Sequence, residues 1–213
     1  MKLAIEGRRQ WIAWGALMIC LSGAQTAWAD PLQLTVQPVT AKPGDLNDAF
    51  NVYVTNLGAA PIDVAAFNFE ISTTSSDITF EQATTGTTLF PYVFAGNSGF
   101  GPVVSTSSPG QTLDASDVAA APNSFTVINP ATSFGLGLIS FDVAPGAASQ
   151  VAPVSLNTNL AFTSVSDQFG NLQTLEFAPG DITVSAVPEP STGMLVLAPL
   201  AGLIWRKRFR RWK

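Results

Sequence analysis

The sequence predicts an all-β fold, an antiparallel β-sandwich flanked by a short apolar segment at each end of the chain. Three observations favour this architecture. Apolar and polar residues alternate through the middle of the chain, clusters of Gly, Pro, Asn and Asp interrupt the alternation, and nine of the ten basic residues lie in the two ends. The first two patterns are typical of short strands joined by turns. The third separates the ends from the middle.

Strand-like alternation is clearest in three runs of the first half. In 32–39, 50–56 and 62–71, large apolar residues recur at every second position, as in Phe67 and Phe69. Side chains two positions apart lie on the same face of a strand, so each run can bury one face. No stretch of the middle has helical periodicity. Further strand-like runs follow at 77–83, 124–128, 134–143, 152–157, 160–167, 172–177 and 181–185.

Turn signals separate these runs. The segment KPGD at 42–45 places a proline at the second position of a predicted turn. The segment DQFGN at 167–171 is typical of a hairpin turn with Gly170 or Asn171 at positive φ. Short runs joined by such turns indicate a sandwich of about nine strands.

A calcium site is the alternative interpretation of both turns. Asp167 with Gly170 and Asn171 could offer oxygen ligands, and so could Asp45 with Asp48. Calcium takes six to eight oxygens, usually from several acids close together. Each group supplies only two or three, so structural turns are the preferred interpretation.

The segment 84–124 is rich in Gly, Ser, Thr and Pro and has the weakest strand pattern. It predicts two or three short strands on long loops, or a partly mobile segment. Asp114 and Asp117 are spaced like paired ligands, but a solvated loop is the favoured interpretation. Exposed aromatic rings could stack on sugars, whereas ordinary core packing is the favoured role for such residues. The aromatic candidates for sugar contact are Tyr53, Phe90, Tyr92, Phe94 and Phe100.

Composition excludes several kinds of site. The 213 residues include no histidine and one cysteine, Cys20, which lies in the first apolar segment. The middle therefore lacks the usual ligands of structural zinc, haem and iron–sulfur clusters, and it lacks a Ser-His or Cys-His nucleophile pair. Residues 30–186 carry thirteen acids and one base, Lys42, a formal charge of −12. We expect no metal, no cofactor and no nucleic-acid partner.

The middle of the chain resembles the cohesin family. The likeness lies in LTVQPVTAKPGDLNDAFNVYVTNL with VAAFNFEIS near its start, in GLGLISFDV at 135–143 and in VSDQFGNLQTLEFAPGDITV at 165–184. These segments match an opening strand, turn and alternating strands, a later strand, and a closing hairpin with the last strand. The resemblance covers most of 32–185 and implies a cohesin-like jelly roll. Cohesins bind dockerin modules, but no dockerin-facing residues are recognised, so that partner is not carried over.

The first 29 residues have the three parts of a secretory signal peptide. Two arginines, Arg8 and Arg9, precede an apolar region at 11–24. Ala27 and Ala29 are the small residues that signal peptidase recognises, which places the cut after Ala29.

Two alternatives for this first segment are weaker. The apolar region is short for an uncleaved membrane anchor. A lipoprotein signal would acylate Cys20, but Ile19 is too bulky for the position before such a cysteine. Cleavage after Ala29 leaves a mature protein without cysteine, which suits a compartment outside the cytoplasm.

The last 27 residues closely resemble a PEP-CTERM sorting signal. Pro188, Glu189 and Pro190 form the triplet, an apolar run follows at 194–205, and six of the last eight residues are basic. The resemblance implies recognition by a membrane exosortase. It also implies delivery to the surface or the exopolysaccharide matrix of a bacterium with an outer membrane.

The apolar run also predicts how the precursor is held. Sixteen uncharged residues, 190–205, form a helix of about 24 Å, shorter than a hydrocarbon core of about 30 Å. Long basic side chains beyond the run can reach the headgroups and stay cytoplasmic. We expect a short transmembrane helix in the inner membrane, with a stop formed by Arg206, Lys207, Arg208, Arg210 and Arg211.

The sequence thus predicts a signal peptide at 1–29, a cohesin-like β-sandwich at 30–186 and a sorting signal at 187–213. The favoured function is a secreted, non-enzymatic protein with an adhesive or structural role at the surface or in the matrix. Its expected partners are signal peptidase, exosortase and either exopolysaccharide or another surface protein. The alternative is a carbohydrate-binding module. A hydrolase with paired carboxylates is the third hypothesis, although no pair stands out.

Overall fold

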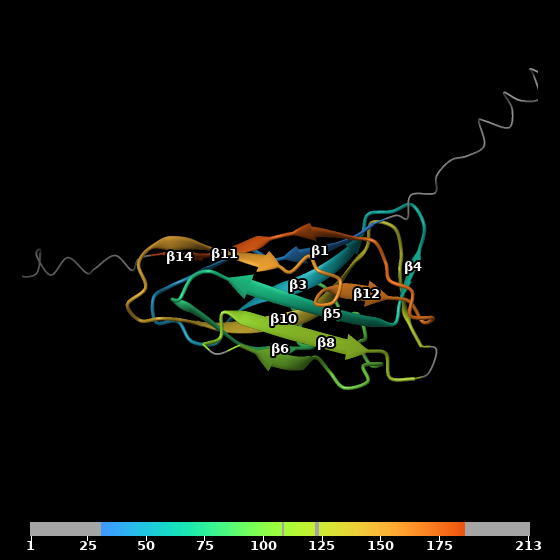
Figure 1. The fold of residues 1–213 in the computed structure, drawn as a ribbon, viewed down its shortest axis with the longest axis horizontal. Coiled ribbons are helices and arrows are strands. Elements are labelled where there is room, and N and C mark those ends of the chain that lie inside the picture. The colour runs from blue at the N-terminus through green and yellow to red at the C-terminus, as the bar shows by residue number, and fades with distance from the viewer. Residues whose placement is uncertain (1–30, 108, 122–123, 186–213) are drawn as a thin grey trace, which may run out of the picture.

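The computed structural model describes residues 31–107, 109–121 and 124–185, which form a β-sandwich whose strands run along the long axis of the molecule (Figure 1). Every regular element of this part is a strand. Within the same residues, no helix is long and apolar enough to cross a membrane. The all-β prediction is therefore confirmed for the middle of the chain.

Two sheets form the sandwich, and a short antiparallel pair of strands from distant parts of the sequence lies at one end. The first sheet has the order β13 (Leu175–Ala178), β1 (Leu32–Val36), β3 (Asp48–Asn56), β10 (Ser133–Val143) and β6 (Ile78–Thr84). The second has the order β2 (Val39–Ala41), β14 (Gly180–Val184), β11 (Gln150–Leu156), β5 (Ala66–Thr73), β8 (Thr112–Val118) and β7 (Val103–Thr106), with β12 (Ser164–Ser166) also paired to β5. The end pair is β4 (Ile62–Val64) and β9 (Thr126–Ile128).

The core lies between the sheets and consists of the side chains that the alternation predicts. Phe50 of β3 contacts Phe80 of β6 and Phe141 of β10, with ring centroids 6.1 and 5.7 Å apart. Such aromatic pairs add to the free energy that comes from burying their area. The predicted inward residues are all buried, namely Leu32, Leu34, Val36, Phe50, Val52, Val54, Phe67, Phe69 and Ile71.

The first and last strands close the sandwich by crossing from one sheet to the other. The chain leaves β1 in the first sheet, passes Pro38 and enters β2 in the second sheet. The last strands do the same at Pro179, between β13 and β14. Proline has no backbone N–H to donate, so the ladder is interrupted there at little cost.

This closure corrects two details of the sequence prediction. The pairs β1–β13 and β2–β14 are parallel, so the sandwich is not purely antiparallel. The described part of the chain has fourteen strands rather than about nine, because breaks such as those at the two prolines divide longer strands into shorter ones.

Gly180 allows the two crossing strands to approach each other. A Cβ at this position would lie 2.6 Å from the carbonyl oxygen of Val36 and 2.9 Å from its Cγ1 atom. Real Cβ atoms do not come so close to backbone, so a side chain would push β14 away from the end of β1. A glycine at this point is a requirement of the fold.

Gly180→Ala is expected to lower the free energy of unfolding of the sandwich by about 1–3 kcal/mol, the usual cost of overpacking. Gly146→Ala is the matched control, because a Cβ there would meet no atom within 4 Å. The urea midpoint of residues 30–186 measures both effects. Equal midpoints for the two variants would contradict the close approach of Gly180 to Val36.

Candidate functional site

The long connection 85–102, called here the crossing segment, covers part of the outer face of the first sheet. Thr88 donates its backbone N–H to Oδ1 of Asn51 at 2.9 Å, and the Asn51 amide donates to the Thr88 hydroxyl at 2.9 Å. The rings of Phe90 and Tyr53 lie 5.0 Å apart. A Cβ on Gly135 of β10 would collide with Thr87 at 2.5 Å, so a glycine there lets the segment lie against the strand.

The next part of the crossing segment enters the core at one end. Tyr92 and Phe94 are buried, and both rings contact Phe67 of β5. The Phe67 and Phe94 rings are stacked with centroids 5.8 Å apart, and Tyr92 meets Phe67 edge-on at 6.3 Å. The segment therefore closes the end of the sandwich with aromatic rings.

Asp117 of β8 anchors this segment. Its side chain is only 3% exposed, and it accepts hydrogen bonds at 2.6 Å from both the Tyr92 hydroxyl and the Ser98 hydroxyl. Its other oxygen accepts the backbone N–H of Val118 at 2.8 Å. A buried carboxylate needs such donors, because an unpaired charge in the interior is costly.

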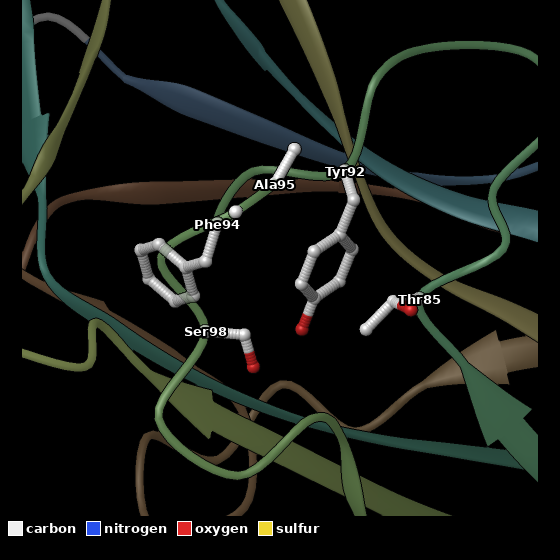
Figure 2. Close-up of a pocket in the computed structure, with 6 residues that line it drawn as sticks. Thr85, Tyr92, Phe94, Ala95 and Ser98 are labelled. Carbon is white, nitrogen blue, oxygen red and sulfur yellow. The ribbon is translucent and has the colours of Figure 1, made fainter.

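A pocket of about 320 Å³ opens beside this anchor, and Figure 2 shows Tyr92 and Thr85 facing each other across it. Phe94, Ala95, Gly96 and Ser98 complete the lining. The hydroxyls of Tyr92 and Ser98 donate to Asp117, so they present no further hydrogen to a ligand. The side chains at this pocket are best explained as the anchor of the crossing segment.

The Tyr92 hydroxyl is also difficult to ionise. Its burial, its hydrogen bond to Asp117 and the negative charge of Asp117 all raise the pKa of Tyr92 far above its usual value. Tyr92 therefore stays a hydrogen-bond donor throughout the neutral range.

The outer face of the second sheet is different, because open sheet surface extends across β11, β5, β8 and β7. We call it the open face. Along β11, Val151, Pro153 and Ser155 are exposed while the residues between them are buried. Val103 of β7, 59% exposed, lies opposite Ser116 of β8. The outward residues of the two central strands are Ala66, Asn68, Glu70 and Ser72 of β5 and Thr112, Asp114, Ser116 and Val118 of β8.

Small hydroxyl and apolar side chains surround two carboxylates on the open face. Glu70 and Asp114 are direct partners in the β5–β8 register. The Asn157 amide donates to Oε1 of Glu70 at 2.6 Å. Partial burial, the negative charge of Glu70 and a hydrogen bond with Glu70 raise the pKa of Asp114. The pair lies on an open sheet surface, not across a cleft of the kind that the hydrolase hypothesis requires.

The structure separates two acids that the sequence spacing brought together. Asp114 points outward from β8, whereas Asp117 is buried on the inner side of the same strand. Both lie in a strand, so the expected solvated loop is wrong at this point. The prediction of short strands within 84–124 is confirmed by β7 and β8.

The predicted turns are confirmed. Gly44 and Gly170 have φ values of 84° and 80°, and the Asp45 N–H donates to the Lys42 carbonyl at 3.1 Å. One Asp167 oxygen accepts the backbone N–H groups of Phe169 and Asn171 at 2.8 and 2.9 Å. The hydrogen bond from the Asn171 side-chain amide lowers the pKa of Asp167, and these backbone bonds lower it further.

The candidate calcium ligands of the first turn accept hydrogen bonds from the backbone. Asp45 accepts the Lys42 N–H at 2.7 Å, and Asp48 accepts the N–H of Ala49 at 2.9 Å. Among the residues that the structure describes, no group of three or more acids, histidines or cysteines could hold a metal ion.

The five aromatic candidates for sugar contact have different environments. Tyr92 and Phe94 are core residues, and Tyr53 and Phe90 pack on each other. Phe100 is 81% exposed at the end of the crossing segment. Phe169, 78% exposed at the tip of the 167–171 turn, is an exposed aromatic that the sequence analysis did not single out.

The sorting residues Pro188, Glu189 and Pro190 lie outside the described residues, as do Ala27 and Ala29 of the signal peptide and the basic cluster from Arg206 to Arg211.

The prediction missed Glu70, Asn157 and the anchoring role of Asp117. The alternating pattern of 62–71 places Glu70 on the polar face, but no local signal pairs it with Asp114, because that contact joins strands far apart in the sequence.

Comparison with solved structures identifies the fold. The seventh ScaB type I cohesin from Pseudobacteroides cellulosolvens has a TM-score of 0.56 at 15% identity, and the match covers 76% of this chain and 96% of that chain. The CaCohA2 cohesin from Clostridium acetobutylicum has a TM-score of 0.55 at 18% identity, with 74% and 92% covered. The OlpA cohesin of Clostridium thermocellum, solved in a type I cohesin–dockerin complex, has a TM-score of 0.56 at 13% identity, with 73% and 99% covered.

These similarities show that the described residues between 31 and 185 have a cohesin-like β-sandwich fold, as the sequence resemblance implied. No protein-family model matches the chain. No curated protein matches it either.

Tyr92→Phe removes one donor from the buried Asp117 carboxylate and is expected to cost about 1.5–3 kcal/mol of stability. Thermal unfolding followed by circular dichroism measures this loss, and limited proteolysis should show faster cleavage within 85–102. Phe100→Ala is the control, because an exposed side chain contributes within about 0.5 kcal/mol.

The same variant is expected to change the alkaline limit of stability. A group with a raised folded-state pKa contributes stability that is complete below its unfolded pKa, about 10 for tyrosine, and is lost at higher pH. The wild type should therefore lose more stability than Tyr92→Phe between pH 9 and 11. Parallel pH curves for the two proteins would contradict a raised pKa of Tyr92 in the folded state.

Proposed function

We propose that this protein is a secreted, non-catalytic binding module with an adhesive or structural role, and that it holds a protein partner on the open face. The observation that carries the proposal is the difference between the two outer faces. The crossing segment packs on the first sheet at Asn51 and Tyr53, whereas β11 and β7 expose Val151, Pro153 and Val103.

The chemistry of the open face suits a protein surface. It is a pleated sheet surface with apolar side chains among hydroxyls, and the apolar side chains can be buried by a partner while the hydroxyls find hydrogen bonds. The related solved complexes pair cohesins with dockerins, which are proteins. By analogy of fold alone, a protein is the preferred class of partner here.

A carbohydrate is the second candidate ligand, and the exposed rings of Phe100 and Phe169 favour it. Aromatic rings at loop tips can stack on sugar rings, as in a module that binds exopolysaccharide. The observations favour the protein partner, because these rings lie at loop tips and the open face itself displays aliphatic and hydroxyl side chains.

We also propose that the chain reaches the cell surface or matrix through its ends. The signal peptide would direct export, and an exosortase would act at Pro188-Glu189-Pro190 while the basic end holds the precursor in the inner membrane. This part rests on the sequence resemblance alone.

A photoreactive residue in place of Ser105 or Ser116, on the open face, is expected to crosslink to a protein on the surface of producing cells. The matched control replaces Gln33 on the outer face of the first sheet and should yield fewer adducts. Adducts are identified by mass spectrometry. Adducts that resist protease but not glycosidase would support the carbohydrate alternative, and equal labelling from both faces would contradict the open face as the binding surface.

Replacing Pro188, Glu189 and Pro190 by alanine is expected to leave uncleaved precursor in the inner membrane of a host with the matching exosortase. The triplet lies outside the sandwich, so the stability of residues 30–186 should not change. Cell fractionation with immunoblotting measures sorting, and the urea midpoint measures folding. Surface delivery as efficient as that of the parent would contradict the sorting proposal.

A further inference from the structure

Two carboxylates face each other at the centre of the open face. Glu70 of β5 and Asp114 of β8 occupy the same register position on adjacent antiparallel strands and the same side of the sheet. Directly opposed residues have Cβ atoms about 4.5–5.5 Å apart, and like charges in this arrangement weaken the strand pairing.

The neighbouring elements provide hydrogen bonds but no positive charge. Beyond β8, Ser105 of β7 lies opposite Asp114. On the other side of β5, the Asn157 amide donates to Glu70 at 2.6 Å. Ser164 of β12 bonds Asn68.

Among the residues that the structure describes, no other charged group neutralises the pair. A further acid on this face is Asp181 of β14, which lies beyond β11 and accepts a hydrogen bond from the Thr183 hydroxyl. Lys42 is the one base between residues 30 and 186. It lies in the turn before β3 and donates its backbone N–H to Asp45.

A proton is therefore the simplest species that can relieve the repulsion. Burial and the facing Glu70 charge raise the pKa of Asp114, so the folded protein binds this proton more readily than the unfolded chain does. The stability that Asp114 contributes by binding this proton is complete below the pKa of an unfolded aspartate. It is lost as the pH rises through the pKa of Asp114 in the folded protein.

We propose that the Glu70–Asp114 pair is a proton-sensitive element of the open face, which binds one proton on acidification and thereby loses one negative charge and strengthens the β5–β8 contact. The effect on stability is a property of the sandwich itself. The consequence for docking rests on the proposed function: a partner would meet a less acidic surface at low pH and a more acidic one at neutral pH.

The experiment compares melting temperatures of the full chain, in a mild non-ionic detergent, from pH 7 to pH 4. Asp114→Asn removes the repulsion and should melt about 1–4 °C above the wild type at pH 7. This difference should shrink as the pH falls, because the wild-type carboxyl then carries its proton. Glu70→Gln should behave in the same way and serves as a second variant if Asp114→Asn folds poorly. Glu176→Gln, on the exposed side of β13, is the control for loss of one acid.

A wild type and an Asp114→Asn variant with parallel pH curves would overturn the proposal. The proposal would also be overturned if Glu176→Gln melted above the wild type at pH 7 and this difference shrank equally as the pH fell. The effect would then come from net charge and not from the facing pair. No partner is needed for these measurements. The proton-sensitive element can therefore fail while the binding function stands, and the crosslinking experiment can fail while the pH effect stands.

Discussion

The close contact between the first and last strands is the constraint on which the rest of the sandwich depends. Both strands cross between the sheets at a proline, Pro38 or Pro179, and pair in parallel on each side of the crossing. Gly180 makes the contact with Val36 sterically feasible. Because residues from the two ends of the domain must meet, the fold gains its closure only when nearly the whole domain is in place.

The crossing segment then makes the two outer faces unequal. Asn51 holds it on the first sheet, and Asp117 holds it at the end of the second. Both anchors are buried polar side chains with several hydrogen bonds, which confer a defined position on a segment with little regular structure. Since this connection lies over part of the first sheet, the second sheet has the more open outer face of the two.

The sequence predicts those features that depend on local patterns. Alternation in 50–56 and 62–71 identified the inward residues. The segments KPGD and DQFGN marked turns, and Gly170 of the second has the expected positive φ. Parallel closure was not predictable in this way, because it depends on contacts between strands about 140 positions apart. The pairing of Glu70 with Asp114 and the burial of Asp117 are likewise long-range, so spacing alone placed Asp114 and Asp117 together although they point to opposite sides of β8.

The two acidic residues of β8 have opposite surroundings. Asp117 is surrounded by donors from Tyr92, Ser98 and the backbone, so its charge supports the structure. Asp114 instead faces another carboxylate, an arrangement that strand pairing does not favour. Asp114 weakens the local strand pairing and lies on the outer surface of the sheet. Departures from the rules of packing are expected at functional surfaces, so this position suits binding better than folding. The proposed binding role of the open face and the charge of its central pair therefore depend on the same two strands, β5 and β8.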